Sequence, residues 1–289
     1  MIDLIRGLEQ AHFTTPAHVA VGVFDGLHLG HRHLVGAMVQ AARAAGQAAI
    51  VVTFDPHPGM VLGGRVRLLS TIEEQAGLLE GLGVDALVVL LFTPAVADTP
   101  AFDFAAALQR HLGMVALWAG PDFALGRRRE GTTDFLRRAG ETLGFSVHVE
   151  GPVEWGGAPV SSTRIRVALA AGNLDEANGC LGRPYCFAGV LENGGDAARL
   201  PGYLCAGVAA APERLVPADG IYGCALRAGG GESEPVVAAV EAAHSPAVCV
   251  FRRAGGVAPS GFPVCLEFHT RFSENPSGPD LGVALASLE

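Results

Sequence analysis

The sequence contains no lysine, so all of its fixed positive charge comes from arginine. This absence excludes a Walker-type phosphate-binding loop, a Schiff-base nucleophile and a lysine phosphate clamp, because each of them needs that side chain. The 20 basic residues are outnumbered by 29 acidic ones, and the formal charge of −9 argues against broad binding to nucleic acids or anionic membranes. An anionic substrate would therefore be bound by locally placed arginines and by backbone N–H groups.

Long hydrophobic runs are also missing. The first six residues contain no apolar segment of the length found in secretory signals, and the most apolar stretch, residues 84–92, contains Asp85 and is too short to span a bilayer. All six cysteines lie between residues 180 and 265, and none forms a Cys-x-x-Cys pair. We therefore expect a cytoplasmic protein with buried free thiols, without a disulfide framework, a zinc site or a membrane partner.

The composition is that of a globular protein, since 49% of the 289 residues are hydrophobic and 17% are charged. Strand and helix signals alternate through residues 1–180, which predicts an α/β domain with a Rossmann-like, doubly wound parallel sheet. After Gly182 the pattern changes to short apolar segments separated by glycine, proline and aspartate. This spacing predicts a small antiparallel β-barrel over residues 181–289.

The most informative stretch lies near the start of the chain. A β-branched run at residues 19–21 leads into Gly-Val-Phe-Asp-Gly at 22–26, then His28-Leu29-Gly30-His31 and a helical pattern to Ala42. Histidines three residues apart on a helix share one face, and Gly30 lets a ligand approach the backbone. Because N–H groups at a helix start favour an anion, we expect a nucleotide phosphate beside the two imidazoles. The alternative is a pair of surface histidines.

This pattern resembles the His-x-Gly-His signature of nucleotidyltransferases. Together with the preceding Gly-x-Phe-Asp-Gly it resembles the adenylyltransferase half of bacterial bifunctional riboflavin kinase/FAD synthetases. A later run, residues 161–166, reads Ser-Ser-Thr-Arg-Ile-Arg and matches the Ser-Ser-Thr-x-x-Arg signature with which such enzymes hold the β- and γ-phosphates. Alone, that run would be an ordinary capped helix.

The resemblance implies transfer of AMP from ATP to FMN, giving FAD and pyrophosphate, with Mg²⁺ bridging the phosphates. No protein nucleophile is required, because positioning and charge stabilisation carry such a reaction. The residues implied as catalytic are His28, His31 and Arg164, and those implied as nucleotide-binding are Gly22, Phe24, Asp25, Gly30, Ser162, Thr163 and Arg166.

Two further segments are candidates for the flavin site. A strand over residues 48–54 ends in Asp-Pro-His-Pro, similar to a Phe-x-Pro-His-Pro run of the family, and ligands of such sheets lie at the carboxyl ends of strands. The loop at residues 120–131 resembles the family's Gly-x-Asp/Asn-Phe-x-Phe-Gly, with Leu125 in place of the second aromatic residue. We expect one arginine of this loop at most to touch the ligand, and residues 92–104 to serve packing. The implied flavin-binding residues are Phe54, His57, Asp122, Phe123 and Arg127.

The second half resembles the scaffold of the family's riboflavin kinase domain without its chemistry. Cys205 and Gly207 stand where the family has a threonine and an asparagine that serve ATP and Mg²⁺, and a thiol or a hydrogen offers a hard cation no oxygen. The catalytic glutamate should fall at residues 247–249, where there is no carboxylate, and Glu241 and Glu267 are out of register. A Pro/Ser/Gly-rich tail, residues 273–282, replaces the usual C-terminal helix. We predict an inactive kinase domain kept for packing, flavin binding or association.

Three alternatives stay open at this point. Val23 stands where the family usually has a polar residue, commonly asparagine, which allows an enzyme specialised for another nucleotide, a modified flavin or another phosphorylated acceptor. A catalytically silent nucleotide- or flavin-binding regulator is possible, although the intact histidines argue against it. The third alternative is a kinase that has kept its activity through displaced residues.

Overall fold

The computed structural model describes residues 2–193, 203–228, 233–242, 248–253, 261–275 and 280–286. The chain forms two compact units, one made of Met1–Val66 and Ile72–Val160, the other of Arg67–Thr71 and Ser161–Glu289. This division differs from the expected boundary between residues 180 and 181, because helices α7 (Ser162–Ala170) and α8 (Leu174–Leu181) pack together and α8 packs on barrel strands. No helix in the described ranges is long and apolar enough to cross a membrane.

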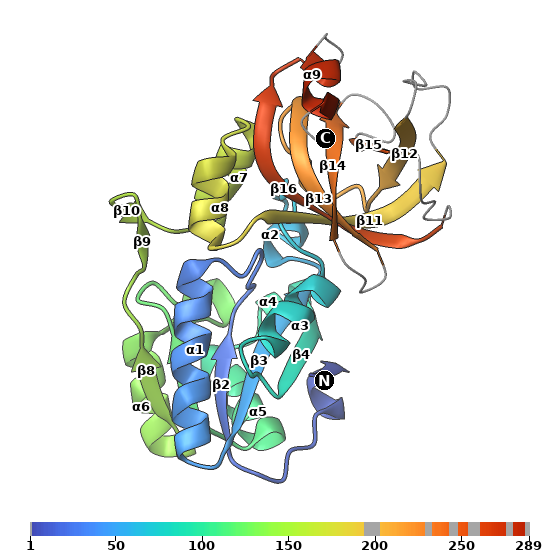
Figure 1. The fold of residues 1–289 in the computed structure, drawn as a ribbon. Coiled ribbons are helices and arrows are strands. Elements are labelled where there is room, and N and C mark those ends of the chain that lie inside the picture. Colours follow the sequence, from blue (N-terminus) through green and yellow to red (C-terminus); the bar gives the residue numbers. More distant parts are fainter. Residues whose placement is uncertain are drawn as a thin grey trace. The chain divides into compact units, whose positions relative to one another are not determined.

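The first unit is built on a six-stranded, wholly parallel sheet with the order β1-β4-β3-β2-β5-β8 (Figure 1). Alternate residues of its central strands pack on opposite faces: Val19 and Val21 lie against helices α5 and α6, and Ala20 lies against α1 and α3. This confirms the predicted doubly wound sheet. The strands are β1 (Asp3–Arg6), β2 (Ala17–Val21), β3 (Ala48–Asp55), β4 (Ala86–Leu91), β5 (Met114–Ala119) and β8 (Ser146–Val149), and the helices are α1 (Leu29–Ala44), α2 (Pro58–Val61), α3 (Ile72–Glu80), α4 (Pro94–Ala97), α5 (Ala101–Leu112) and α6 (Thr133–Leu143).

Small elements complete this unit. Two short hairpins, β6 (Ala124–Leu125) with β7 (Gly131–Thr132) and β9 (Glu154–Trp155) with β10 (Ala158–Pro159), follow β5 and β8 respectively. The 3₁₀ turns are η1 (Leu8–Gln10) and η2 (Arg127–Arg129). Because every strand of the main sheet is parallel, the segments after β2, β3, β4 and β5 all emerge at the same edge, where ligands of such sheets bind.

The second unit contains a closed barrel of six antiparallel strands in the order β11-β12-β15-β14-β13-β16, which confirms the predicted barrel. Tyr185, Tyr222 and Phe268 are fully buried, and Phe268 lies against both tyrosine rings. The elements are β11 (Tyr185–Asn193), β12 (Tyr203–Ala209), β13 (Gly220–Ala228), β14 (Ser233–Val240), β15 (Val248–Arg253), β16 (Pro263–Ser273) and α9 (Asp280–Ala286).

Two expectations for this unit were wrong. The C-terminal segment contains a helix, α9, whose Ala284 and Leu285 pack against Ile221 and Phe251 of the barrel. The helix is short and follows a segment rich in proline and glycine, so its pattern is weak in the sequence. Cys186 and Cys265 are joined by a disulfide between the neighbouring strands β11 and β16, whereas the other four cysteines are free thiols. The two partners are 79 residues apart, so their pairing depends on strand register that the sequence does not reveal.

The short segment Arg67–Thr71 belongs to the second unit although it lies between α2 and α3 in the chain. The Leu68 N–H donates to the Glu213 carbonyl at 2.7 Å, and the Leu215 N–H donates to the Leu68 carbonyl at 2.9 Å. Arg214 beside them is 2% exposed and donates to the Cys186 carbonyl at 3.0 Å. These bonds hold the segment as a short parallel bridge on the second unit.

Candidate active site

The two histidines of the first motif form a stacked pair at the start of α1. His28 is the N-cap residue, and its Nδ1 accepts a hydrogen bond from the His31 N–H at 3.4 Å. The ring centroids are 3.7 Å apart with an interplanar angle of 16°. A Cβ on Gly30 would lie only 3.2 Å from the His28 ring, which explains why glycine stands between them. The predicted juxtaposition of the two imidazoles is confirmed.

The environment of this pair keeps His31 neutral. Burial lowers its pKa well below the ordinary value, and the neighbouring His28 lowers the pKa further. The His31 Nδ1 atom is buried and has no hydrogen-bond partner within the described residues. The neutral ring carries one N–H donor, and the helix start favours an anion. The neutral His31 ring can therefore donate one hydrogen bond to a phosphate.

The turn between β2 and α1 has an unusual backbone. Phe24 and Leu27 adopt positive φ angles of 51° and 39°, which non-glycine residues rarely do. The Thr53 hydroxyl donates to the Val23 carbonyl at 3.0 Å and ties the turn to β3. Gly22 faces the Phe24 ring so closely that a Cβ would lie 3.1 Å from it. Asp25 is buried beside them, so the implied nucleotide-binding residues of this turn are held in one compact structure.

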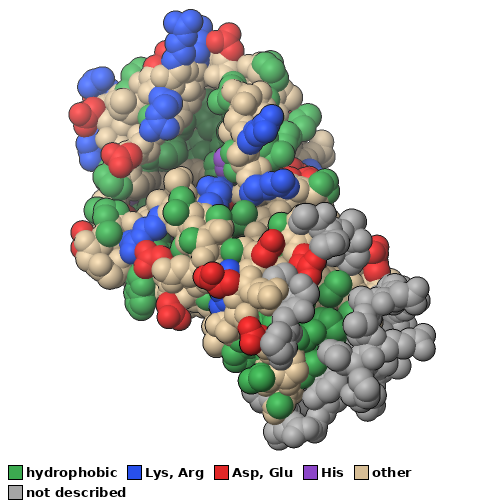
Figure 2. All heavy atoms as spheres, turned by 90° about the horizontal axis from the view of Figure 1, so that it is seen from above, with side chains coloured by type: hydrophobic (Ala, Val, Ile, Leu, Met, Phe, Trp, Pro, Cys, Tyr) green, Lys and Arg blue, Asp and Glu red, His purple; other side chains and the backbone are tan. Residues whose placement is uncertain are grey.

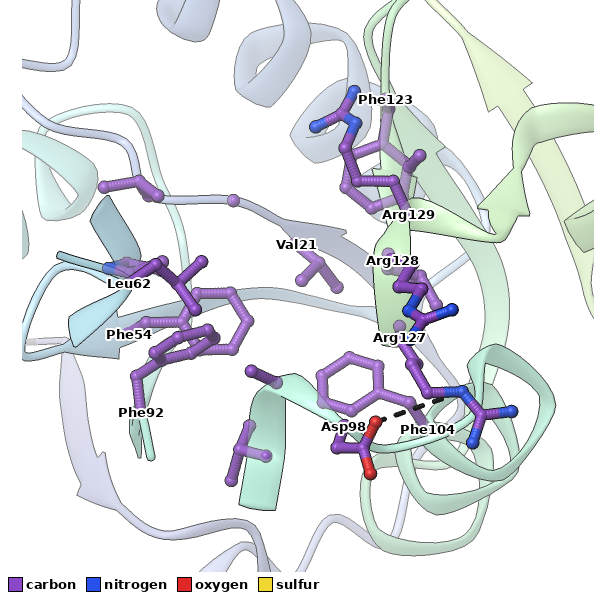
Figure 3. A pocket seen from close by; sticks show the side chains of 18 of the residues that line it. Val21, Phe54, Leu62, Phe92, Asp98, Phe104, Phe123, Arg127, Arg128 and Arg129 are labelled. Carbon is purple, nitrogen blue, oxygen red and sulfur yellow. Dashed lines mark ion pairs between the residues drawn. The ribbon is translucent and has the colours of Figure 1, made fainter. Parts of the chain in front are cut away.

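A cavity of about 790 Å³ opens at the carboxyl edge of the same sheet. Its walls are mostly apolar, and Figure 3 shows Phe54 and Phe92 across the cavity from the arginines of the 120–131 loop. Figure 2 shows a hollow lined by apolar side chains with arginine side chains around its edge. Val21 at the end of β2 lines the cavity together with Gly22 and Val23, which lead into the histidine motif. A flat aromatic ligand fits a cavity of this size and character.

The cavity collects most of the residues implied for flavin binding. Phe54, Asp122, Phe123 and Arg127 all line it. His57 is not among the lining residues; its Nδ1 accepts the Gly59 N–H at 2.9 Å and caps α2.

Sequence reasoning missed other parts of the wall. Phe92, Asp98 and Phe104 line the cavity, although residues 92–104 were expected to serve packing alone. The available signal was the position of Phe92 directly after a buried strand, at the edge where ligands bind. Contact of any of these side chains with a ligand stays a prediction.

The arginine loop forms one rim of the cavity. Arg127 Nε lies 4.0 Å from the Asp98 carboxylate, the pair marked by the dashed line in Figure 3. Arg129 donates to the Asp122 carbonyl at 2.7 Å. Arg128 and Arg129 adopt positive φ angles of 51° and 61°. The rim is therefore cationic, and part of its backbone has the left-handed conformation that is rare for residues other than glycine.

The second predicted cluster starts α7 and belongs to the second unit. The Ser161 hydroxyl caps the helix by accepting the Arg164 N–H at 3.2 Å. Arg164 Nε forms an ion pair with Glu176 at 2.5 Å, and Arg166 donates to the Arg67 carbonyl at 2.8 Å. Both arginines are thus bound within their own unit, and Glu176 is a partner that the motif did not indicate. Roles of Ser162, Thr163, Arg164 and Arg166 toward a nucleotide stay predictions.

Comparisons with known proteins show the family of the chain. The chain matches the FAD synthetase family over residues 10–164. The bifunctional riboflavin kinase/FMN adenylyltransferase of Pseudomonas fluorescens is 35% identical over 227 residues, 76% of this chain and 72% of that protein. The protein of the same name from Listeria monocytogenes is 33% identical over 215 residues, 73% of this chain and 68% of that protein.

A crystal structure described as a macrolide-efflux protein from Streptococcus pneumoniae superposes with a TM-score of 0.84, covering 100% of this chain and 96% of that one. Its sequence identity of 24% carries the fold alone. The motif residues, their placement at the sheet edge and the matched relatives lead to one conclusion: the chain belongs to the FAD synthetase family.

Proposed function

We propose that the protein transfers AMP from ATP to FMN, forming FAD and pyrophosphate. The observation that carries this proposal is the stacked His28–His31 pair at the start of α1, in the same unit as a large aromatic cavity. The relatives named FMN adenylyltransferase support the choice of substrates.

In this reaction an FMN phosphate oxygen attacks the α-phosphorus of ATP. A new P–O bond forms, the bond from the α-phosphorus to the oxygen that bridges it to the β-phosphorus breaks, and pyrophosphate leaves with that oxygen. Charge grows on the α-phosphate and on the leaving oxygen, where His28 and His31 donate hydrogen bonds from a preorganised stack. The first-turn N–H groups of α1 add their dipoles to the same charge.

The acceptor ring would occupy the aromatic cavity. Phe54, Phe92 and Phe104 offer ring faces and edges, since Phe54 lies 5.4 Å from Phe92 and 6.4 Å from Phe104 between centroids. Burial of a tricyclic ring there supplies affinity, and the arginines of the rim can donate hydrogen bonds to electronegative atoms of the ligand.

The hydroxyls of Ser162 and Thr163 and the charges of Arg164 and Arg166 would hold the pyrophosphate end. The described residues contain no cluster of three or more metal-ligating side chains. We infer that a Mg²⁺ ion would be held mainly by the nucleotide's own oxygens and water, which is usual for this cation. When bound, Mg²⁺ supplies charge neutralisation between the phosphates.

We further propose that the second unit has lost riboflavin kinase activity. Cys205 packs with Cys249 and Leu281 against the apolar cluster beneath α9. The environment raises the Cys205 thiol pKa, first through its hydrogen bond with Cys249 and then through burial, so it stays a neutral thiol. Such a group is not a ligand for a hard cation. The segment 194–202, with the shortened basic run, lies outside the described residues.

One experiment tests both statements. Purified protein is incubated with ATP and Mg²⁺ and either FMN or riboflavin, and the products are separated by chromatography. We expect FAD from FMN and no FMN or FAD from riboflavin. Absence of FAD from FMN would overturn the proposed adenylyl transfer, and phosphorylation of riboflavin would overturn only the statement about the second unit.

A further inference from the structure

The arginine rim stores backbone strain at two successive positions. Arg128 and Arg129 have φ angles of 51° and 61°, in the left-handed region that favours glycine and asparagine. Both side chains line the cavity. Strain of this kind persists only where the surroundings enforce it, and it gathers at ligand-binding sites.

The surroundings do enforce it. A Cβ on Gly126 would lie 2.6 Å from the Ala101 Cα, and one on Gly131 would lie 2.7 Å from the Ala101 Cβ, so both ends of the loop are pressed against α5. The Arg127 N–H donates to the Thr99 carbonyl at 2.8 Å, and the Glu130 carboxylate accepts the Ala101 N–H at 2.9 Å. The backbone of the loop is therefore preorganised against the start of α5.

The three arginines differ in what they bind. Arg127 faces the Asp98 carboxylate and Arg129 donates to the Asp122 carbonyl. The Arg128 guanidinium has no hydrogen-bond or ion-pair partner among the residues that the structure describes. It is the arginine of this loop whose donors are available to a ligand, whereas the family resemblance had implied Arg127.

We propose that Arg128 binds the acceptor, donating hydrogen bonds from its guanidinium to an oxygen of the flavin, either a phosphate oxygen or a ring carbonyl. The inference deepens the proposed function and rests on it. Hydrogen bonds from a charged guanidinium are stronger than those from a neutral donor, and its planar fork suits a phosphate or carbonyl oxygen. Arg128 combines the positive φ angle with a place in the cavity wall.

The test measures flavin affinity by fluorescence quenching, without ATP, for FMN and for riboflavin. R128A removes the guanidinium and keeps a side chain at the strained position, whereas R128G removes the guanidinium and relieves the strain. R110A is the matched control, an exposed arginine at the end of α5 outside the cavity. We expect both Arg128 variants to bind FMN about 10-fold or more weakly, as for other lost hydrogen bonds to charged groups. The KM for FMN should rise with them, and the melting temperature of R128G should not fall.

The outcomes separate the possible sources of the contact. An equal loss for FMN and riboflavin assigns the contact to a ring carbonyl, and a loss for FMN alone assigns it to the phosphate. FMN affinity that is retained in R128G would overturn the proposal, even if R128A binds weakly, because only loop conformation would then matter. Wild-type protein that binds neither flavin would overturn it as well. Wild-type protein that binds FMN but forms no FAD would overturn the proposed reaction and not this contact.

Discussion

The two units differ in where their backbones depart from relaxed geometry. Among the described residues, every non-glycine residue with a positive φ lies in the first unit: Phe24, Leu27, Arg128 and Arg129. The first two form the turn into the histidine motif and the last two form the cavity rim. The described strands and helices of the second unit contain no such residue. Since strain of this kind gathers at functional sites, the contrast supports the proposal that the histidine pair and the flavin cavity of the first unit form the reacting centre.

Replacement of the histidine pair should have the largest effect and is the most direct test of this contrast. His28→Ala and His31→Ala should each lower kcat by on the order of 10² or more, because each removes a preorganised donor to developing charge. FMN binding should change little, since neither ring lines the cavity. His33→Ala on the same helix is the matched control; its ring pairs with Glu150 at 3.1 Å and should be dispensable. Unchanged kcat in both site variants would contradict the assignment of chemistry to this unit.

Substitution in the aromatic wall of the cavity should have the next largest effect. Phe54→Ala opens the cavity and removes ring contacts with Phe92 and Phe104, so we expect FMN affinity to fall by about 10-fold. Steady-state kinetics should show the effect mainly in KM. Phe54→Leu, which keeps most of the apolar volume, should recover part of the loss. A kcat effect as large as that of His28→Ala would show that the wall positions the reacting atoms as well.

A smaller effect should appear in the pH dependence of stability. Burial lowers the pKa of His31. As the pH falls, the imidazole of His31 therefore becomes protonated in the unfolded chain while it is still neutral in the folded protein. Stability is thus complete above the unfolded pKa of about 6.5 and falls as the pH drops below it, by at most about 1.4 kcal/mol per pH unit from this group. Denaturant unfolding between pH 7 and 5 should show this slope, and His31→Gln should reduce it. An unaltered slope would mean that other groups, such as His18 with its lowered pKa, dominate.

The smallest expected effect on catalysis lies in the barrel. Replacing Cys186 and Cys265 by serine removes the disulfide between β11 and β16 and should destabilise the second unit, by about 2–4 kcal/mol for a typical bridge. FAD formation from FMN should continue at the wild-type rate under conditions where the barrel stays folded. Thermal unfolding measured on the same samples as activity separates an effect on stability from an effect on catalysis. A proportional loss of kcat would show that the scaffold contributes to the reaction.

Local patterns in the sequence predicted most of the fold. The β-branched runs that became β2, β3, β4 and β5 and the alternating segments of the barrel were found because each is bounded by turn residues. Strand β12 was missed, since Tyr203–Ala209 contains glycine, alanine and cysteine and few β-branched residues. Helix α8 was overlooked because its eight residues include Asn178 and Gly179, which weaken the helical signal.

In the candidate site, too, local patterns predicted some features and missed those that depend on tertiary contacts. The three-residue spacing of His28 and His31 predicted their stack, because helical geometry alone brings them together. Phe104 was indistinguishable from a core residue, since it lies on an amphipathic helix whose apolar face is otherwise buried. The partners of Arg164 and Arg166 and the left-handed backbone of Arg128 depend on tertiary contacts, which no local pattern contains.

The bridge formed by Arg67–Thr71 has a consequence for dissecting the molecule. The chain passes from one unit to the other at residues 66/67, 71/72 and 160/161, so no single cut yields two whole parts. A fragment ending at Val160 would keep Leu68 but lose Glu213 and Leu215, the carbonyl and N–H partners that satisfy it. Truncation at residue 160 would therefore remove the hydrogen-bond partners of this segment together with the barrel.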